Sequence, residues 1–384
     1  MRIAYIAVKG IPACGGIETV TEEIGSRLVK RGHQVTVYSS RDYGTREDAW
    51  HKGMEIKTVP SINTKAFHKL SICFHATRDV MRRRNADLVH FHAVGPSIFS
   101  IFPRLAGIPT VVQVHGLEWM RDKWGLMAKT FFRLSDYTVA CFPTKATAVS
   151  MVQKDYYERR FRKEIVYIPN GVKAVHRESP DWILRCGLVP GRYILFAARL
   201  VEEKGAHLLI SAFRALDTDM SLVIAGDAAH SGRYKARLRD LAGDDARIFF
   251  PGFVAGKPLQ ELFSNAYLFC LPSTLEGMPV ALLEAMSYGN CCVASDIREN
   301  REALEDYGYT FENRNTDDLR RVIRELIAQP HLVEAKKSVL REYVRNIPSW
   351  DRVTDMMEQL YLSMVPEGRQ LENPPAPPFR QAVN

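Results

Sequence analysis

The chain lacks the features that would place it in several common classes of protein. None of its 384 residues lies in an uninterrupted apolar run of the roughly 18 residues that a membrane-spanning helix needs. The apolar run ahead of Lys9 is shorter than the core of a secretory signal peptide. The seven cysteines form neither a Cys-x-x-Cys pair nor a zinc-binding spacing, and no Gly-x-Gly-x-x-Gly motif is present. We therefore expect a cytoplasmic protein with reduced, buried cysteines and no dinucleotide cofactor.

Positive charge is distributed unevenly along the chain. Residues 1–170 carry 26 Lys and Arg against 15 Asp and Glu, a net charge of +11, whereas residues 171–384 carry 26 against 29, a net charge of −3. This asymmetry favours peripheral contact between the N-terminal half and an anionic membrane surface. A solvated basic face without a partner is an equally good interpretation. We expect no nucleic-acid partner.

Short apolar runs alternate with helical patterns, which predicts parallel sheets covered by helices on both faces. The alternation begins with a strand at 3–8, places a strand in the run 136–143 and a helix at 145–160, and restarts with a strand at 193–200. We therefore predict an α/β fold of two Rossmann-like domains that face a cleft. The predicted divisions are an N-terminal domain at 1–172, a linker at 173–190, a C-terminal domain at 191–345, a helix at 346–365 that packs back on the N-terminal domain, and a disordered Pro-rich tail at 366–384.

The run PSTLEGMPVALLEAMSYG at 272–289 is the strongest local signal for a functional site. Glu276 lies in a predicted loop and Glu284 in the helix that follows, so the two carboxylates lie at most about 12 Å apart. Glycosidase pairs stand roughly 5–9.5 Å apart across one bond, so the spacing argues against hydrolysis. It suits two ends of a nucleotide sugar, with the free amides of the helix N-terminus facing the diphosphate. For the spacing alone, two surface glutamates without a ligand are the commoner interpretation.

Several motifs in order resemble those of family 4 glycosyltransferases. The run at 272–289 resembles their E-x7-E signature, and AARLVEEKG at 197–205 resembles their R-x4-K element. The opening at 9–40, with a glycine pair before a helix, and IPNGV at 168–172 are similar to further family elements. QVHGLEWMRDKWG is similar to a subset that works in bacterial exopolysaccharide or O-antigen (lipopolysaccharide) assembly. The resemblance covers roughly residues 1–360.

The resemblance implies the two-domain GT-B fold and transfer of a sugar with retention of its anomeric configuration. It implies that Arg199 and Lys204 neutralise the departing diphosphate, that Glu276 holds the sugar and Glu284 the ribose, and that His115 lies near the transferred sugar. The implied catalytic residues are His115, Glu276, Arg199 and Lys204. The implied donor-binding residues are Gly15, Gly16, Arg199, Lys204, Phe253, Val254, Glu276, Gly277, Met278 and Glu284.

The expected co-substrate is a UDP-, GDP- or dTDP-sugar, and the expected acceptor is a saccharide or a lipid-linked saccharide. No cofactor or divalent metal is obligatory in this scheme, because cations of the chain neutralise the diphosphate. His90 and His92 share one strand face, but no further ligand pattern accompanies them. A nucleotide-sugar epimerase of the same shape and a non-catalytic nucleotide-sugar-binding module are the alternatives.

The sequence also departs from the family pattern. Lys173 stands where an Asp is common, Cys291 and Cys292 replace Pro-Val, and Met278-Pro279 replace Phe-Gly. IRENREAL replaces a Gly-rich turn, and we expect it to form a turn that brings Glu299 and Glu302 near the sugar pocket. A stripe of Trp124, Met127, Phe131 and Leu134 on a helix predicts an interfacial helix, although packing on the domain core is at least as good an interpretation.

Overall fold

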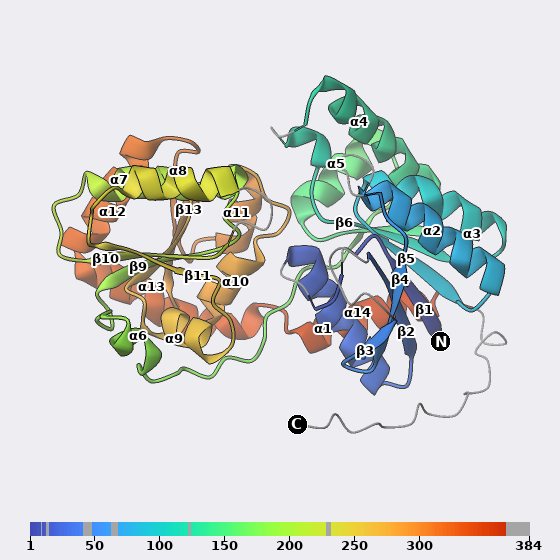
Figure 1. Cartoon of the computed structure of the whole chain (residues 1–384), viewed down its shortest axis with the longest axis horizontal. Coiled ribbons are helices and arrows are strands. Elements are labelled where there is room, and N and C mark those ends of the chain that lie inside the picture. The colour runs from blue at the N-terminus through green and yellow to red at the C-terminus, as the bar shows by residue number, and fades with distance from the viewer. Residues whose placement is uncertain are drawn as a thin grey trace.

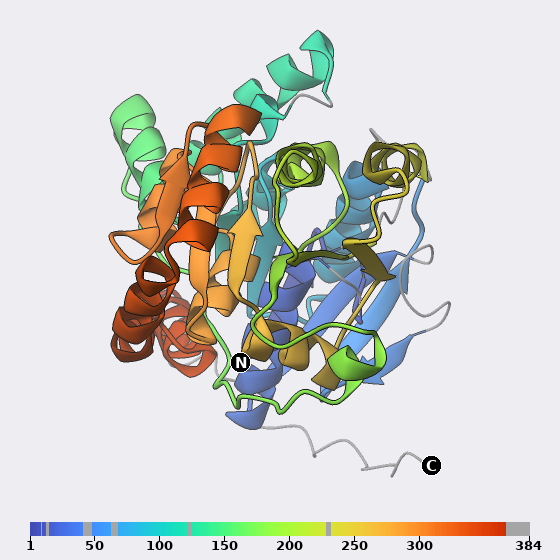
Figure 2. The same ribbon diagram turned by 90° about the vertical axis from the view of Figure 1, so that its left-hand side faces the viewer.

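The protein consists of two α/β units side by side, as the computed structural model shows (Figure 1). The structure describes residues 1–8, 10–12, 15–40, 48–62, 68–121, 124–227 and 232–365. Each unit is built on one sheet, and Figure 2 shows helices on both faces of the second sheet. Gly15 and Gly16 are described, whereas Cys14 before them and the predicted Pro-rich tail at 366–384 lie outside the described residues.

The first sheet has eight strands in the order β3-β4-β2-β1-β5-β6-β7-β8, and only the edge pair of β3 and β4 is antiparallel. The strands are β1 (Arg2–Ile6), β2 (Gln34–Ser40), β3 (Ala49–His51), β4 (Met54–Val59), β5 (Leu88–His92), β6 (Thr110–Val114), β7 (Lys145–Ala148) and β8 (Val166–Tyr167). The helices of this unit are α1 (Gly16–Lys30), α2 (His68–Arg83), α3 (Ile101–Leu105), α4 (Leu126–Cys141) and α5 (Met151–Phe161), with short 3₁₀ turns η1 (Gly95–Ser100) and η2 (Glu118–Met120).

The second sheet has six parallel strands in the order β11-β10-β9-β12-β13-β14. They are β9 (Tyr193–Ala197), β10 (Ser221–Ala225), β11 (Ile248–Gly252), β12 (Leu268–Leu271), β13 (Cys291–Ser295) and β14 (Tyr309–Phe311). The helices are α6 (Trp182–Arg185), α7 (Ala206–Arg214), α8 (Gly232–Ala242), α9 (Lys257–Asn265), α10 (Val280–Ser287), α11 (Arg298–Leu304), α12 (Thr316–Ala328) and α13 (Pro330–Tyr343), with 3₁₀ turns η3 (Glu202–Lys204) and η4 (Val344–Asn346). These two parallel arrays confirm the predicted fold class.

Each sheet has one point where the order of its strands reverses, between β1 and β5 in the first and between β9 and β12 in the second. In open parallel sheets, ligands bind outside the carboxyl ends of the strands at such a point. The segments that follow β1 and β5 in the first unit, and β9 and β12 in the second, are therefore the expected places for a site, and the segment after β6 lies next to them because β6 pairs with β5. His115 follows β6, Lys204 follows β9 and Glu276 follows β12.

The last helix, α14 (Trp350–Leu362), lies against α1 of the first unit, red beside blue in Figure 1. Trp350, Met357 and Tyr361 are buried in the same apolar cluster as Ile3 and Tyr5. Ion pairs from Arg27 to Asp351 (2.9 Å) and from Arg31 to Asp355 (2.6 Å) border that cluster. The chain therefore passes from the first unit to the second and returns to complete the core of the first.

The region 136–160 corrects the sequence-based prediction. Residues 136–141 continue helix α4, and the strand β7 is formed by Lys145–Ala148, which the prediction had placed in a helix. Asp136 is fully buried on α4 and accepts hydrogen bonds from the Tyr156 hydroxyl (2.9 Å) and the Tyr157 hydroxyl (2.6 Å). These tertiary contacts outweigh the strand preference of the β-branched and aromatic residues nearby.

Two further expectations are corrected. Cys73, Cys270, Cys291 and Cys292 are buried as predicted, but Cys141 is exposed and Cys186 is half-buried. IRENREAL forms helix α11 instead of a turn. Among the described residues, no helix is both long enough and apolar enough to cross a membrane.

Candidate functional site

The two units touch backbone to backbone between the loop after β6 and the loop before α10. A Cβ atom on Gly277 would lie 1.8 Å from the carbonyl oxygen of His115, and one on Gly116 would lie 3.8 Å from the Cα of Gly277. No side chain fits at position 277 without moving one unit, so a glycine is required there. Within the second unit, Gly205 (φ +71) approaches Pro272 as closely, since its Cβ would lie 1.9 Å from the Pro272 carbonyl oxygen. These contacts bring the segments after β6, β9 and β12 to one place.

Two of the residues predicted for the site form an ion pair there. Lys204 Nζ lies 2.6 Å from Glu276 Oε1, and the two side chains are 18% and 7% exposed. Arg199, which follows β9, is exposed, and its side chain makes no hydrogen bond or ion pair within the described part of the chain. The segment after β9 therefore holds one cation paired to Glu276 and a second, exposed cation available to an anionic ligand.

A third cation, Arg121, was missed by the sequence analysis. It pairs with Glu118 of its own unit at 3.0 Å and with Glu203 of the other unit. Burial alone would lower the pKa of Arg121, but Glu118, Glu203 and Glu276 together raise it. The sequence shows an arginine in the run after β6, but its partner Glu203 is 82 residues away and cannot be inferred from spacing.

Glu284 projects from α10 at the same junction. Burial raises the pKa of its carboxyl group, Lys173 lowers it, and Glu23 of α1 raises it further. Lys173 Nζ lies 2.9 Å from Glu23 Oε1, so the residue that replaces the family's Asp ties the connecting segment to α1. Met278 meets the first unit through its carbonyl oxygen, which accepts a hydrogen bond from Asn170 Nδ2 at 3.4 Å.

His115 lies in a group of uncharged imidazoles. Its Nε2 is 3.1 Å from Nδ1 of His92, and the rings of His90 and His92 stack with centroids 4.3 Å apart. Burial, assisted by the positive charge of Lys69, lowers the pKa of His115 to about 3, against an opposing effect of Glu118. Within the described residues, no three or more His, Cys, Asp and Glu side chains gather as a metal ion would require.

The glycine pair stands at the start of α1, with Gly15 in extended conformation (φ 177). Glu18 of the first helical turn folds back over it, because its Oε2 lies 2.1 Å from where a Cβ of Gly15 would be. An anion is stabilised at a helix N-terminus, and Glu18 supplies one from the chain itself. A phosphate predicted at Gly15 and Gly16 would therefore have to displace the Glu18 carboxylate.

Phe253 and Val254 follow β11, at the carboxyl edge of the second sheet. Phe253 is 57% exposed, whereas Val254 packs partly against the core of the second unit. Gly252 before them adopts positive φ (+78), which turns the chain away from the strand. Because Phe253 is exposed, this loop is accessible to a flat ligand such as a nucleotide base.

Glu299 and Glu302 of α11 lie in different surroundings. Glu299 is buried, and the negative charge of Glu276 contributes to raising its pKa after the larger effect of burial. Glu302, however, accepts hydrogen bonds from the backbone N–H groups of Met151 (2.6 Å) and Val152 (3.1 Å), so it caps α5 of the other unit instead of lining a sugar pocket.

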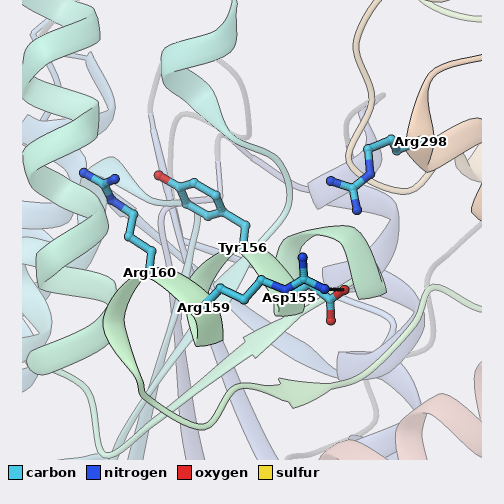
Figure 3. A pocket seen from close by; sticks show the side chains of 5 residues that line it. All are labelled: Asp155, Tyr156, Arg159, Arg160 and Arg298. Carbon is cyan, nitrogen blue, oxygen red and sulfur yellow. Dashed lines mark ion pairs between the residues drawn. The ribbon is translucent and has the colours of Figure 1, made fainter.

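Beside this cap lies a shallow hollow of 490 Å³ between α5 and α11 (Figure 3). Its lining combines three arginines, one tyrosine and one aspartate, namely Arg159, Arg160, Arg298, Tyr156 and Asp155. Arg159 and Asp155 form a long ion pair of 3.6 Å. None of the five was predicted as a site residue, and the hollow depends on the two units meeting.

Comparison with known proteins identifies the family. The model described as "Glycosyltransferase Family 4" matches residues 14–175, and that described as "Glycosyl transferases group 1" matches residues 189–346. The chain therefore belongs to the glycosyltransferases that carry these two domains, and the predicted resemblance is confirmed.

Individual relatives are distant but match over most of the chain. The gpi3 subunit of the phosphatidylinositol N-acetylglucosaminyltransferase of Schizosaccharomyces pombe is 23% identical over 93% of this chain and 79% of its own. An Escherichia coli α-1,3-galactosyltransferase named for the acceptor GlcNAc-diphosphoundecaprenol is 25% identical over 74% of this chain and 78% of its own. The crystal structure of HepE from Anabaena, solved with UDP and glucose, superposes with a TM-score of 0.77 at 18% identity, covering 94% of this chain and all of that one.

Proposed function

We propose that the protein is a retaining, metal-independent glycosyltransferase that moves a hexose-type sugar from a nucleoside-diphosphate sugar to a saccharide or lipid-linked saccharide acceptor. Its place is cell-surface polysaccharide synthesis at the cytoplasmic face of a membrane. The observation that carries the proposal is the Lys204–Glu276 pair near the backbone contact between His115 of one unit and Gly277 of the other, together with Arg199, whose side chain has no partner within the described residues.

The chemistry follows from the charges at this junction. When a donor enters, its diphosphate takes Lys204 and Arg199 as counterions, and Glu276 is released to accept hydrogen bonds from sugar hydroxyls. The bond between the anomeric carbon and the phosphate oxygen breaks, and the acceptor oxygen attacks from the same face. The departing phosphate oxygen takes the acceptor proton, and the nucleoside diphosphate leaves. Electrostatic stabilisation of the leaving group supplies the main lowering of the barrier.

The donor's remaining parts have candidate partners. Glu284 accepts hydrogen bonds from the ribose, and the backbone at Phe253 and Val254 meets the base. Gly277, Met278 and the amides that open α10 face the diphosphate, while Gly15 and Gly16 contribute amides once Glu18 has moved. HepE was solved with UDP, which supports a uridine nucleotide as the first donor base to test.

The acceptor side is assigned to the first unit. The acceptors in the names of the yeast and bacterial relatives are lipids or lipid-linked sugars, which supports an acceptor held at a membrane. On α4, Leu126 and Met127 are 83% and 89% exposed, and Leu134 is exposed as well. Trp124 and Phe131 of the predicted stripe are half-buried, so the exposed apolar surface of α4 is formed by Leu126, Met127 and Leu134 and not by the whole stripe. Apolar side chains within residues 1–170, whose net charge is +11, suit an anionic lipid surface.

A panel of nucleotide sugars tests the central proposal. Slow release of nucleoside diphosphate with one sugar, undiminished by EDTA, is the expected result. Interconversion of the sugar without release would favour the epimerase, and binding without turnover would favour the binding module. Complete loss of turnover with EDTA and rescue by Mn²⁺ or Mg²⁺ would overturn metal independence.

Co-sedimentation with vesicles of graded anionic lipid content tests the membrane contact. Binding should rise with anionic lipid and fall with salt. The variant Leu126→Ser/Met127→Ser should bind less, whereas Leu184→Ser, which changes an exposed leucine of the other unit, should bind like the wild type. Failure of the wild-type protein to bind at low salt would favour a soluble acceptor.

A further inference from the structure

The imidazoles beside His115 divide into two differently bonded parts. His90 and His92 are each 1% exposed and stack with an interplanar angle of 17°, and Tyr5 meets both rings edge-on. His90 Nδ1 lies 2.5 Å from the hydroxyl of Tyr361 on α14, and His90 Nε2 has no partner within the described residues. His90 is thus bonded away from the site, and only His92 connects to His115 by a hydrogen bond.

His92 is the middle of a three-membered chain. Its Nδ1 lies 3.1 Å from His115 Nε2, and its Nε2 lies 3.5 Å from Thr21 Oγ1 on α1. Burial, with the positive charges nearby, holds the pKa of His92 well below its usual range, and that of His115 is lowered as well, so both rings are neutral. A neutral imidazole has one donor and one acceptor nitrogen, so each link has a direction that fixes the next.

Thr21 sets that direction. It is fully buried, and His92 Nε2 is the sole hydrogen-bond partner of its hydroxyl among the described residues. If His92 donated to Thr21, the hydroxyl proton would be left in the core without an acceptor, at a cost of about 1–3 kcal/mol. The hydroxyl therefore donates to Nε2 of His92, which places the proton of His92 on Nδ1, and that proton is donated to Nε2 of His115.

We propose that Thr21 and His92 are positioning residues that hold His115 as the tautomer with its proton on Nδ1. This inference rests on the proposed function for its consequence: His115 presents an N–H donor to an oxygen of the bound sugar and has no free basic nitrogen. It therefore does not take the acceptor proton, which agrees with transfer of that proton to the departing phosphate. Before any ligand binds, Nε2 of His115 already accepts the hydrogen bond from His92, and Nδ1 already carries the proton that is donated to the sugar.

The tautomer can be read directly. In protein labelled with ¹⁵N-histidine, the two ring nitrogens of a neutral imidazole differ in chemical shift according to which carries the proton, and the His115→Asn spectrum identifies the signals of His115. We expect Nδ1–H in the wild-type protein and in Thr21→Ser. Thr21→Val removes the hydroxyl at nearly constant shape, so His115 should become a mixture of tautomers. An Nε2–H signal for His115 in the wild type would overturn the proposal.

Replacements of His92 add a kinetic test. The Asn side chain amide can take the place of Nδ1–H, so His92→Asn should keep the tautomer and most of the turnover. His92→Phe keeps the stack on His90 but removes the donor, and His92→Asp offers only acceptors, so each should lower kcat about tenfold, the effect of one buried hydrogen bond, with the donor KM little changed.

Equal kcat for His92→Asn and His92→Phe, both folded, would contradict the positioning role. If His92→Phe does not fold, the wild-type and Thr21→Val spectra still decide. An inactive wild type with the Nδ1–H tautomer would count against the proposed function and not against this chain of hydrogen bonds.

Discussion

At the ends of β5 and β6 the N-terminal unit offers neutral imidazoles, whereas at the ends of β9 and β12 the C-terminal unit offers ions. His92 and His115 are uncharged because burial removes the solvent that would stabilise a proton. Lys204 and Glu276 are also largely buried, and they form an ion pair at 2.6 Å. The difference supports the proposal that the charged diphosphate binds to the C-terminal unit and the acceptor to the N-terminal one, with the transferred sugar between Glu276 and His115.

Removal of a cation from the C-terminal unit should have the largest effect. Arg199→Ala and Lys204→Ala should each lower kcat by about 100-fold or more, because one stabiliser of the departing charge is lost. Lys235→Ala is the matched control. Lys235 is a cation on α8 of the same unit, and it pairs with Asp227 at 2.8 Å. Release of nucleoside diphosphate measures the effect. Normal turnover in folded variants would contradict the proposal that the diphosphate binds at this site.

The contact between the units should be nearly as sensitive. Gly277→Ala forces its Cβ against the His115 carbonyl oxygen, so the two halves of the site move apart, and a displacement of about 1 Å can cost about 100-fold in rate. Gly125→Ala is the control, because a Cβ there meets nothing within 4 Å. If Gly277→Ala turns over like Gly125→Ala, the active arrangement of the units differs from this one.

The two glutamates should separate binding from catalysis. Glu276→Gln should lower kcat more than donor affinity, because its partner is the sugar whose charge changes in the transition state. Glu284→Gln should weaken binding of the free nucleoside diphosphate by about 10- to 100-fold and affect kcat less, since a hydrogen bond to a charged group is worth roughly 1.5–3 kcal/mol. Calorimetry and steady-state kinetics measure both. The opposite pattern would mean that the donor lies along α10 in the orientation opposite to the one proposed.

The parts of this comparison that were predicted from sequence are local. The strands β5, β6, β9 and β12 are short, mainly apolar runs, and helix α10 begins at Val280, one residue after the start that the sequence predicts at Pro279. Motif spacing placed Lys204 and Glu276 each after a strand, and the structure shows that these strands, β9 and β12, are neighbours. The sequence reading assigned them to separate parts of the donor, however, and did not anticipate that they pair with each other.

The parts that were missed depend on how distant segments meet. Arg121 reaches Glu203, and Glu302 caps α5, only because the two units adjoin, and no periodicity in the sequence records that arrangement. The C-terminal half of α4 was misassigned because the tertiary partners of Asp136, two tyrosines of α5, decide its conformation. The direction of the chain from Thr21 through His92 likewise follows from burial, which spacing alone does not give.

The neutral histidines also predict how stability depends on pH. Burial, with a smaller effect of His115, lowers the pKa of His90 to about 3, and the pKa of His92 is also far below its usual value of 6.5. Between pH 6.5 and about 3 the unfolded chain binds a proton at each of these residues and the folded chain does not. Lowering the pH therefore favours unfolding, by roughly 1.4 kcal/mol per pH unit for each histidine once the pH is well below 6.5.

Urea unfolding followed by tryptophan fluorescence at pH 6, 5 and 4 measures this slope. His90→Phe should be less dependent on pH than the wild type by roughly 1.4 kcal/mol per unit, whatever its stability at neutral pH. His176→Phe, at an exposed histidine, should keep the wild-type slope. The slope is the relevant quantity because lost packing changes the free energy of unfolding equally at all three pH values. A buried neutral imidazole changes the differences between the three free energies. An unchanged slope in His90→Phe would mean that His90 is charged in the folded protein, so that the ring stacked on His92 would bring a charge to the neutral side of the junction.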